Sequence, residues 1–232
     1  MYFDWTYLVL VMPAVILALW ANSKVNSTYA KYQKQFSSKK ITAEQAAKIV
    51  LDYNGVNDVR IERVQGNLTD HYDPKANVIR LSESVYSSTS TAAIGVACHE
   101  AGHAVQYAED YAPAKFRMAI VPVTNIGSAL AMPLILLGII LGALSPVISN
   151  LIYVGIACFG LSTVFQLVTL PTEYDASKRA VTAIESNGIL VGEEITGAKR
   201  VLNAAALTYV AALAVSLMQL LRLMLLFGNR KR

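Results

Sequence analysis

The longest stretch of this sequence without a charged side chain constrains its fold more than any other feature. No Asp, Glu, Lys or Arg occurs in the 55 residues from Met118 through Thr172, and two shorter uncharged runs span Trp5 to Ser23 and Val201 to Leu221. A water-facing surface of this extent would normally carry charges. Only 16% of the residues are charged, against roughly 25% in soluble domains. The sequence therefore excludes a soluble globular protein and predicts a membrane protein.

The long uncharged run is predicted to be a membrane hairpin. A bilayer-spanning helix needs about 20 apolar residues, so the run has room for two helices and a short connection. We expect the connection at SPVISN, Ser145 to Asn150, between helices at about Ile120 to Leu144 and Leu151 to Leu170. Because two crossings return the chain to its starting side, everything before Arg117 and everything after Glu173 should share a compartment.

The first apolar segment, about Tyr7 to Trp20, reads as a retained anchor. Asp4 precedes it and no basic residue does, whereas Lys24, Lys31 and Lys34 follow it. This charge asymmetry favours an amino end outside the cell and a following domain in the cytoplasm. A cleaved signal peptide is the alternative, but it would carry basic residues at its start.

The last apolar segment, about Ala204 to Phe227, leaves the number of crossings open. It is long enough to span, but it ends in GNRKR, and the basic tail Arg230 to Arg232 favours the cytoplasm and anionic lipid headgroups. Three alternatives remain open for this segment. It could cross the membrane against the charge rule, lie as a helix in the membrane interface, or form a hairpin buried in an oligomer. The expectation is three to four transmembrane helices.

The charged segment between the first two apolar runs is predicted to form a small α+β domain. Thr42 and Gln45 form a capping box that begins a helix at about Ala43 to Asn54. Short strands are expected at Val59 to Val64 and at Val78 to Leu81. A further helix should run from after Ser90 to about Tyr107.

Residues 99 to 103 read HEAGH, which matches H-E-x-x-H. On a helix, His99 and His103 are four residues apart, so both imidazoles project from one face and can bind one Zn²⁺. Glu100 is placed to reach a metal-bound water. The alternative is that the three side chains are ordinary surface residues, or that they hydrogen-bond to one another in a core. Gly102 is unfavourable within a helix and would let another element approach closely.

Catalytic zinc keeps three protein ligands and one open position, so a third ligand is needed. Glu173 is the first charge after the long uncharged run, on the side that the hairpin shares with HEAGH. If LPTEYDASKRA is helical, Glu173 shares a face with the small residues Ala176, Ser177 and Ala180, which permit close packing. Glu173 is therefore the predicted third ligand, with an ordinary carboxylate at the membrane interface as the alternative.

HEAGH, DHYDPKANVIRLSESVY and LPTEYDASKRA together resemble the YugP-type membrane zinc metallopeptidases of bacteria, over nearly the whole chain. The layout is also similar to HtpX-type and CAAX-prenyl proteases. The resemblance implies a gluzincin-like site, with His99, His103 and Glu173 on zinc and Glu100 as the base, in a small zincin-like domain. In those relatives an Asp four residues after the ligand glutamate orients a histidine. That position is Ser177 here. Either Ser177 or Asp175 would supply a weaker form of this histidine-orienting contact.

The organisation that follows has five segments: an anchor (1–23), a cytoplasmic zincin-like domain (24–117), a transmembrane hairpin (118–172), a cytoplasmic helix with the third ligand (173–200), and a hydrophobic helix with a basic tail (201–232). The fold class is a mainly α membrane protein with a small α+β domain.

Further residues are considered for roles around the metal site. His71, Arg179 and Tyr174 are candidates to stabilise an oxyanion, and a loop histidine is an equal alternative for His71. The resemblance suggests that the strand at Val78 to Leu81 binds an extended peptide by edge pairing. Cys98 lies about 100° around the helix from His99 and is expected to be a buried spectator.

The expected function is a membrane-embedded, zinc-dependent endopeptidase of the cell membrane, with its catalytic domain in the cytoplasm. Its partners are a peptide or protein substrate and the lipid bilayer, and no basic stripe interleaved with aromatic residues indicates nucleic acid. One alternative is a zinc hydrolase of a non-peptide amide, such as a lipid. Another is a membrane scaffold with structural zinc, although such a site normally has four protein ligands and only three are evident.

Overall fold

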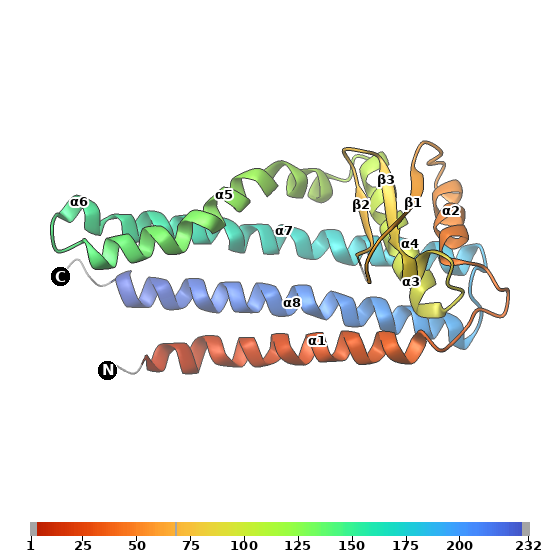
Figure 1. Cartoon of the computed structure of the whole chain (residues 1–232), viewed down its shortest axis with the longest axis horizontal. Coiled ribbons are helices and arrows are strands. Elements are labelled where there is room, and N and C mark those ends of the chain that lie inside the picture. Colours follow the sequence, from red (N-terminus) through yellow and green to blue (C-terminus); the bar gives the residue numbers. More distant parts are fainter. Residues whose placement is uncertain (1–3, 68, 229–232) are drawn as a thin grey trace. The chain divides into compact units, whose positions relative to one another are not determined.

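The computed structural model describes residues 4–67 and 69–228, and the basic tail at residues 230–232 lies outside them. The chain is mainly helical and has four long apolar helices and a small mixed sheet (Figure 1). It divides into two compact units, each built from segments that are distant in the sequence. We call Met1–Trp20, Phe116–Leu170 and Tyr209–Arg232 the apolar unit, and Ala21–Lys115 and Pro171–Thr208 the charged unit.

Four helices are long and apolar enough to cross a membrane. They are α1 (Met12–Tyr32, preceded by the π-helix η1, Tyr7–Val11), α5 (Ala112–Ile140), α7 (Leu151–Ser186) and α8 (Glu193–Gly228). The short helix α6 (Pro146–Ser149) lies in the predicted connection between α5 and α7, where Ser145 caps it. Interior prolines are a common cause of helix bending, and α5, which contains Pro122 and Pro133, is visibly bent in Figure 1.

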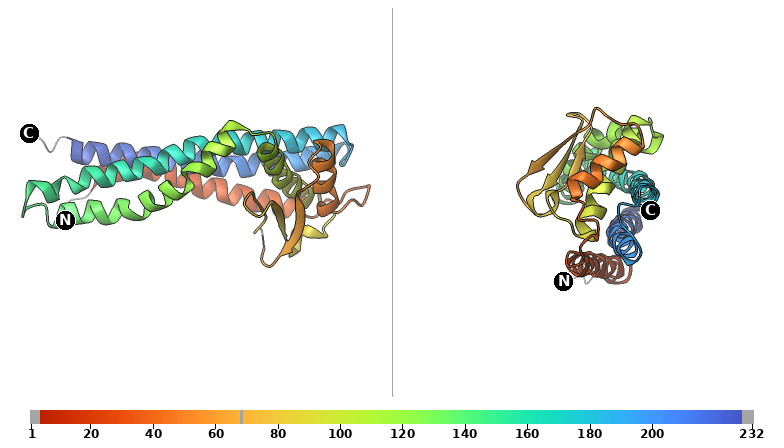
Figure 2. Two further views of the ribbon diagram at one scale, coloured as in Figure 1. Left: turned by 90° about the horizontal axis from the view of Figure 1, so that it is seen from above. Right: turned by 90° about the vertical axis from the view of Figure 1, so that its right-hand side faces the viewer.

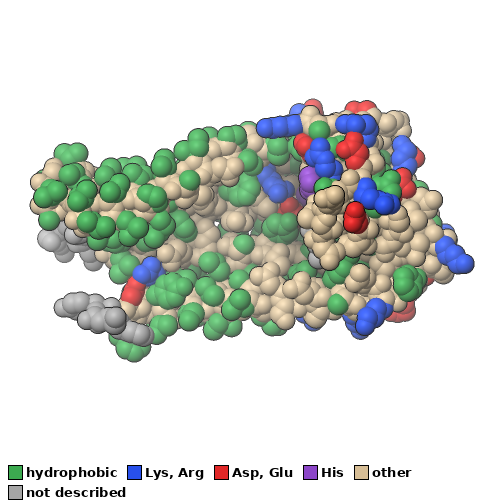
Figure 3. All heavy atoms as spheres, in the orientation of Figure 1, with side chains coloured by type: hydrophobic (Ala, Val, Ile, Leu, Met, Phe, Trp, Pro, Cys, Tyr) green, Lys and Arg blue, Asp and Glu red, His purple; other side chains and the backbone are tan. Residues whose placement is uncertain are grey.

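Apolar side chains cover the outside of the apolar unit (Figure 3). Ile126, Ile140 and Leu144 are 63%, 70% and 76% exposed. Exposed apolar surface this extensive is rare on soluble monomers and is typical of surfaces that face lipid or a partner. In the same figure, most of the charged side chains (Lys and Arg in blue, Asp and Glu in red) gather over the charged unit.

The charged unit contains α2 (Ala43–Tyr53), α3 (Glu83–Tyr86), α4 (Thr91–Ala108) and three strands. The capping box at Thr42 and Gln45 is present as predicted, and Ser90 caps α4 by accepting the backbone N–H of Ala93. Helix α4 contacts both α2 and the sheet, as the views in Figure 2 show. Four of its Ala side chains and Val105 are buried in this core, so α4 is a central element of it.

The sheet has the order β1-β3-β2. Strand β3 (Val78–Ser82) pairs with β1 (Arg60–Val64) in parallel and with β2 (His71–Asp73) in antiparallel orientation. The two expected strands are confirmed, and β2 was missed. The expectation that the strand at Val78 to Leu81 offers a free edge is wrong, because β3 is paired on both sides. Among the described residues the edge strands are β1 and β2, and β2 is the edge strand that contacts α4.

The segment 173–200 is continuous with its neighbours in the structure. Helix α7 runs through Pro171 and Glu173 to Ser186, and α8 begins at Glu193. Gly188 and Gly192 take positive φ values of 58° and 55° in the connection between them, a conformation that glycine adopts without a steric penalty. Glu173 therefore lies on a rigid helix rather than in a loop.

Candidate metal centre

Three potential metal ligands converge in the charged unit. His99 and His103 come from α4 and Glu173 comes from α7. Oε2 of Glu173 lies 3.2 Å from Nε2 of His99 and 3.5 Å from Nε2 of His103. One ligand atom from each residue lies within 4.8 Å of the other two. The structure thus brings together the three residues that the sequence nominated.

The spacing of these atoms fits zinc. Tetrahedral zinc with bonds of about 2.0–2.1 Å places its ligand atoms about 3.3–3.4 Å apart, close to the two distances from Glu173. Two imidazoles and one carboxylate are a common ligand set of catalytic zinc. The Glu173 side chain is only 2% exposed, and each histidine side chain is 15% exposed. A cation here would compensate the buried carboxylate and leave one side of the site accessible.

Small residues allow α4 and α7 to approach closely enough to form the site. A Cβ added at Gly102 would lie only 2.5 Å from the carbonyl oxygen of Ala176. Ala176 and Ala180 are completely buried on the same face of α7 as Glu173. The expected close approach at Gly102 is therefore present, and its partner is the backbone of the helix that carries Glu173.

A hydrogen-bond chain orients His103. Its Nδ1 lies 3.0 Å from Oε1 of Gln106, a fully buried side chain one turn along α4. The Gln106 amide nitrogen donates to the carbonyl of Thr172 at 2.7 Å and to Oδ2 of Asp175 at 2.8 Å. With the amide nitrogen committed to two acceptors, Oε1 is the side of Gln106 that accepts the Nδ1 proton of His103. Nε2 is then left unprotonated for a metal.

Sequence reasoning missed Gln106. The available signal was its position, three residues after His103 on the same face of a helix otherwise rich in Ala and Val. A buried amide among such residues needs partners for its polar atoms. Those partners lie on α7 and could not be identified from the sequence of α4.

His99 has its own contact from α7, because Oγ of Ser177 lies 3.1 Å from Nδ1 of His99. Asp175 contacts Gln106 and accepts the Nε–H of Arg179 at 2.5 Å, and Arg179 also donates to Glu109 at 2.6 Å. Both residues nominated for this supporting role thus have a contact that fits it, Ser177 directly and Asp175 through Gln106.

Glu100 lies beside the edge strand rather than among the three ligands. Its Oε2 accepts the backbone N–H of Tyr72 in β2 at 3.0 Å. Among the described residues Oε1 has no hydrogen-bond partner. One carboxylate oxygen is therefore held in place by the strand, while the other is available to a water molecule.

Burial and neighbouring charges act in opposite directions on His103. Burial alone would lower the pKa of its imidazole, but the carboxylate of Glu173 and the nearby charge of Glu100 outweigh burial and raise the pKa of His103. The site thus attracts positive charge even without a metal. Cys98 is fully buried, which raises the pKa of its thiol, so it stays a neutral spectator as expected.

The remaining nominated residues have other neighbours. His71 is exposed in β2, where Nδ1 lies 2.8 Å from the carbonyl oxygen of Thr69 and Nε2 lies 3.4 Å from Arg80. Arg179 is held by Asp175 and Glu109. Tyr174 lines a separate cavity with residues of α1 and α8. None of the three belongs to the ligand cluster.

A cavity of about 310 Å³ lies between α4 and β2, and its first lining residue on α4, Ala104, is one helical turn after Glu100. Ala104, Tyr107 and Ala108 line it from α4, and Tyr72 lines it from β2. Glu100, Ala104 and Tyr107 share one face of the helix by their spacing. Tyr72 links the cavity to Glu100, because it lines the cavity and its backbone N–H is bonded to Glu100.

A helix with two histidines and an intervening glutamate, together with a glutamate from a second helix, is the residue pattern of an HExxH-type metal centre and makes this cluster a candidate for one. The family model described as "Putative neutral zinc metallopeptidase" matches residues 7–228, and the chain belongs to this family. The chain is also 47% identical over 223 residues to "Putative membrane protease YugP" of Bacillus subtilis (strain 168), covering 96% of this chain and 97% of that protein. No solved structure gave a significant match.

Proposed function

We propose that this protein is a membrane-embedded, zinc-dependent endopeptidase in which His99, His103 and Glu173 hold the metal and Glu100 is the general base. The observation that carries the proposal is the convergence of Nε2 of both histidines with Oε2 of Glu173. Glu100 lies on the same turn of α4, between the two histidines in the sequence, and its Oε1 has no hydrogen-bond partner among the described residues. Membership in a zinc metallopeptidase family supports peptide bonds as the substrate class.

Bound zinc would lower the pKa of a water molecule and polarise the scissile carbonyl. Glu100 would take the proton from this water through Oε1 and deliver it to the leaving amine. The N–H of Tyr72 would hold the other oxygen of Glu100, which fixes the direction of the carboxylate. Gln106 and Ser177 would keep Nε2 of the two histidines directed at the metal.

An extended peptide would bind along the edge of β2 that faces away from β3, since strand edges offer backbone groups for pairing. The N–H of Tyr72 would stay on Glu100. The cavity lined by Ala104, Tyr107 and Ala108 would receive one of its side chains. Tyr72 is suited to guide the peptide, because it contributes to this cavity and its backbone contacts Glu100.

The proposed location is a cell membrane, with the metal centre on the cytoplasmic side. Four helices of spanning length among the described residues, and the similarity to a putative membrane protease of Bacillus subtilis, support the membrane location. The basic residues Lys24, Lys31 and Lys34 directly after the first apolar run support the cytoplasmic side.

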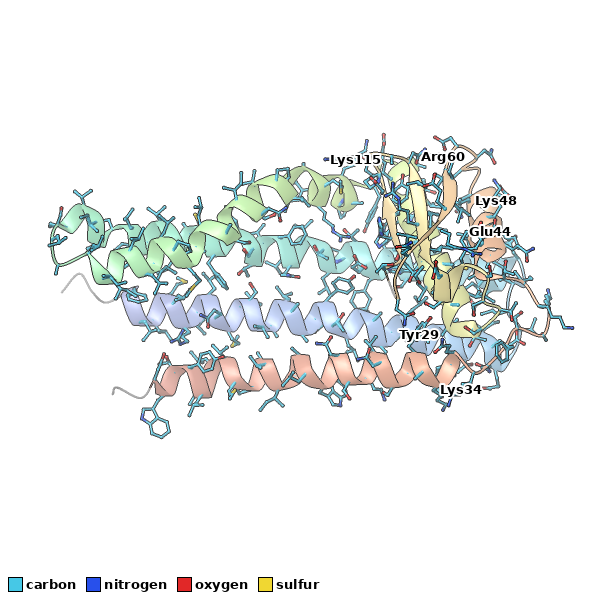
Figure 4. All side chains as sticks on the ribbon, in the orientation of Figure 1. Tyr29, Lys34, Glu44, Lys48, Arg60 and Lys115 are labelled. Atoms are coloured by element: carbon cyan, nitrogen blue, oxygen red, sulfur yellow. The ribbon has the colours of Figure 1, made fainter. Side chains whose placement is uncertain are left out.

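The first experiment replaces Glu100 by Gln in the full-length protein and measures zinc content and peptide cleavage. We expect full zinc occupancy and a loss of cleavage of roughly a hundredfold or more, the usual contribution of a general base. Glu44→Gln is the matched control, because Glu44, labelled in Figure 4, is an acidic residue in the first turn of α2 and does not belong to the ligand cluster. Retained cleavage in a zinc-loaded Glu100→Gln protein would remove Glu100 from the mechanism.

The second experiment tests the third ligand. Glu173→Ala should lose zinc, because two histidines alone hold the metal far more weakly than three ligands. Unchanged zinc stoichiometry would move the third ligand elsewhere. Turnover of membrane lipids without peptide cleavage would favour a lipid amide hydrolase, and a fourth protein ligand on the metal would favour a structural site.

A further inference from the structure

A cavity of about 660 Å³ in the charged unit is separate from the metal centre. Residues of α1, α7 and α8 line it, and none of the metal ligands does. Its volume lies within the range of about 300–1,000 Å³ that is usual for small-molecule sites. The proposed peptidase function leaves this cavity unused.

The charge of the cavity is entirely positive. Lys24, Lys31 and Arg200 line it, and no Asp or Glu does. Arg200 donates to the hydroxyl of Tyr32 at 2.9 Å, and the Lys31 ammonium lies 5.3 Å from the centre of the same ring. Within the described part of the chain, none of the three cations has a carboxylate partner. An anionic ligand is therefore the complement that this cavity lacks.

The cavity lies where the charged and uncharged parts of two helices meet. Lys24 is the first charged residue after the uncharged run in α1, and Arg200 is the last one before the uncharged run in α8. The same lining includes Ala204 and Leu207, within the uncharged run of α8. If these runs cross the bilayer, their ends lie at the level of the lipid headgroups. The cavity then offers cations to a headgroup and apolar side chains to an acyl chain.

We propose that this cavity binds one anionic phospholipid, with the headgroup phosphate among Lys24, Lys31 and Arg200 and an acyl chain along Ala204 and Leu207. Lysine and arginine both bind phosphate well, and arginine does so through paired N–H groups. A basic cavity between helices on the cytoplasmic side is the arrangement that recognises such headgroups. Tyr174 also lines the cavity and directly follows Glu173 on α7, so the lipid would lie one residue from a metal ligand.

The test is a lipid titration of the full-length protein, delipidated in a neutral detergent. Phosphatidylglycerol in mixed micelles is titrated and binding is followed by the protein's thermal stability, with zinc content measured in parallel. We expect saturable stabilisation by phosphatidylglycerol and none by phosphatidylcholine. Lys24→Gln/Arg200→Gln should bind roughly 25-fold more weakly, at about fivefold for each basic residue near an anionic surface.

Matched variants separate this site from general attraction to charge. Lys34→Gln/Lys48→Gln removes the same charge from residues that do not line the cavity, labelled in Figure 4, and should bind like the wild type. The single variant Lys24→Gln guards against misfolding, since among described residues the Lys24 side chain has no hydrogen bond or ion pair to lose. It should weaken binding by about fivefold.

Two further titrations distinguish the sources of the anion. Inorganic phosphate alone should stabilise the protein much less than the lipid, because it cannot use Ala204 and Leu207. Any of three results would overturn the proposal. The first is stabilisation by phosphate equal to that by the lipid, and the second is tighter binding of a peptide with a free carboxylate than of its amide. The third is equal phosphatidylglycerol affinity of Lys24→Gln/Arg200→Gln and the control. These outcomes do not depend on cleavage, so the proposed peptidase function stands or falls separately.

Discussion

At the scale of single residues, the surroundings of Glu100 and Glu173 separate their proposed roles. Glu173 is almost fully buried and faces two imidazoles, which suits a ligand that stays ionised next to a cation. Glu100 is partly exposed and has one oxygen fixed by the N–H of Tyr72. A carboxylate that is held on one side and open on the other is suited to proton transfer.

Gln106 should contribute to metal affinity without touching the metal. Gln106→Leu removes the acceptor for Nδ1 of His103 and leaves the carbonyl of Thr172 without this donor, at nearly constant volume. We expect zinc affinity to fall about 10–100-fold, the usual effect of losing a group that orients a ligand. Competition with a chelator measures it. Glu109→Gln affects only the far end of the hydrogen-bond chain, at Arg179, so its zinc affinity should stay within about threefold of the wild type. Equal losses of zinc affinity in the two variants would contradict the role of Gln106 in orienting His103.

Zinc affinity should also depend on pH through His103. The nearby carboxylates of Glu173 and Glu100 raise the pKa of His103 in the metal-free protein despite its burial. Zinc binds the neutral imidazole, so below this raised pKa affinity should fall about tenfold for each pH unit, and above it the dependence should flatten. Calorimetry in buffers of different ionisation enthalpy would detect the released proton. If zinc binding released no proton even below the ordinary pKa of histidine, His103 would not be the titrating ligand.

At the scale of helices, the site depends on the close approach of α4 and α7 at Gly102. Gly102→Ala places a Cβ 2.5 Å from the carbonyl oxygen of Ala176, so α7 must move. We expect a loss of stability of about 1–3 kcal/mol and weaker zinc binding, because the same movement displaces Glu173. Thermal unfolding and zinc titration measure the two effects.

Gly95→Ala is the matched control on the same helix. Its added Cβ would lie 3.5 Å from the nearest atom, in Ala198, which is an ordinary contact. Alanine is favoured over glycine within a helix by about 1 kcal/mol, so this variant should retain or gain stability. If both variants behaved alike, close packing at Gly102 would not be what the site requires.

The elements of the site were predictable from the sequence to different degrees. Local signals sufficed for α4, because the Ser90 cap, the apolar spacing and HEAGH all lie within one segment. Glu173 required a further argument, that an uncharged run long enough for two helices returns the chain to the same side. Strand β2 was missed because three residues, His71–Asp73, carry too little pattern, and their pairing with β3 is not a local property. For the same reason the free edge was assigned to the wrong strand.

At the scale of the whole molecule, most residues of the uncharged runs belong to the apolar unit and most charged residues belong to the charged unit. The apolar unit has few polar contacts of its own, among them Ser128 with Ser162 and Thr163 with Ser216. Hydroxyl pairs between helices satisfy polar groups where water is absent. The charged unit contains the sheet, the metal ligands and both cavities described above. The candidate metal ligands and the cations of the larger cavity thus lie in one unit, although part of that cavity is lined by the uncharged run of α8.

The ion pair between Asp4 and Arg222 bears on the number of crossings, which the sequence left open. Arg222 follows the uncharged run of α8, and its Nε donates to Oδ2 of Asp4 at 3.0 Å within the apolar unit. The Thr6 hydroxyl and the Arg222 guanidinium lower the pKa of Asp4 to about 2, so the pair stays charged. Because Asp4 precedes the first apolar helix, the end of α8 lies beside the beginning of that helix. A paired Arg222 reduces the electrostatic cost of placing this end outside.

We therefore expect α8 to cross the membrane, giving four crossings with both chain ends on the outer side. A reporter fused after Arg232 should report the same side as one at the amino end and one inserted at Asn150, between α6 and α7. Reporters inserted at Lys34 and at Asn187, which follow α1 and α7, should report the opposite side. If only the fusion after Arg232 reported the side of Lys34, α8 would lie in the interface or turn back, and the basic tail would override the ion pair. Asp4→Asn tests the cause, because an unpaired Arg222 should increase the fraction of molecules with a cytoplasmic carboxyl end.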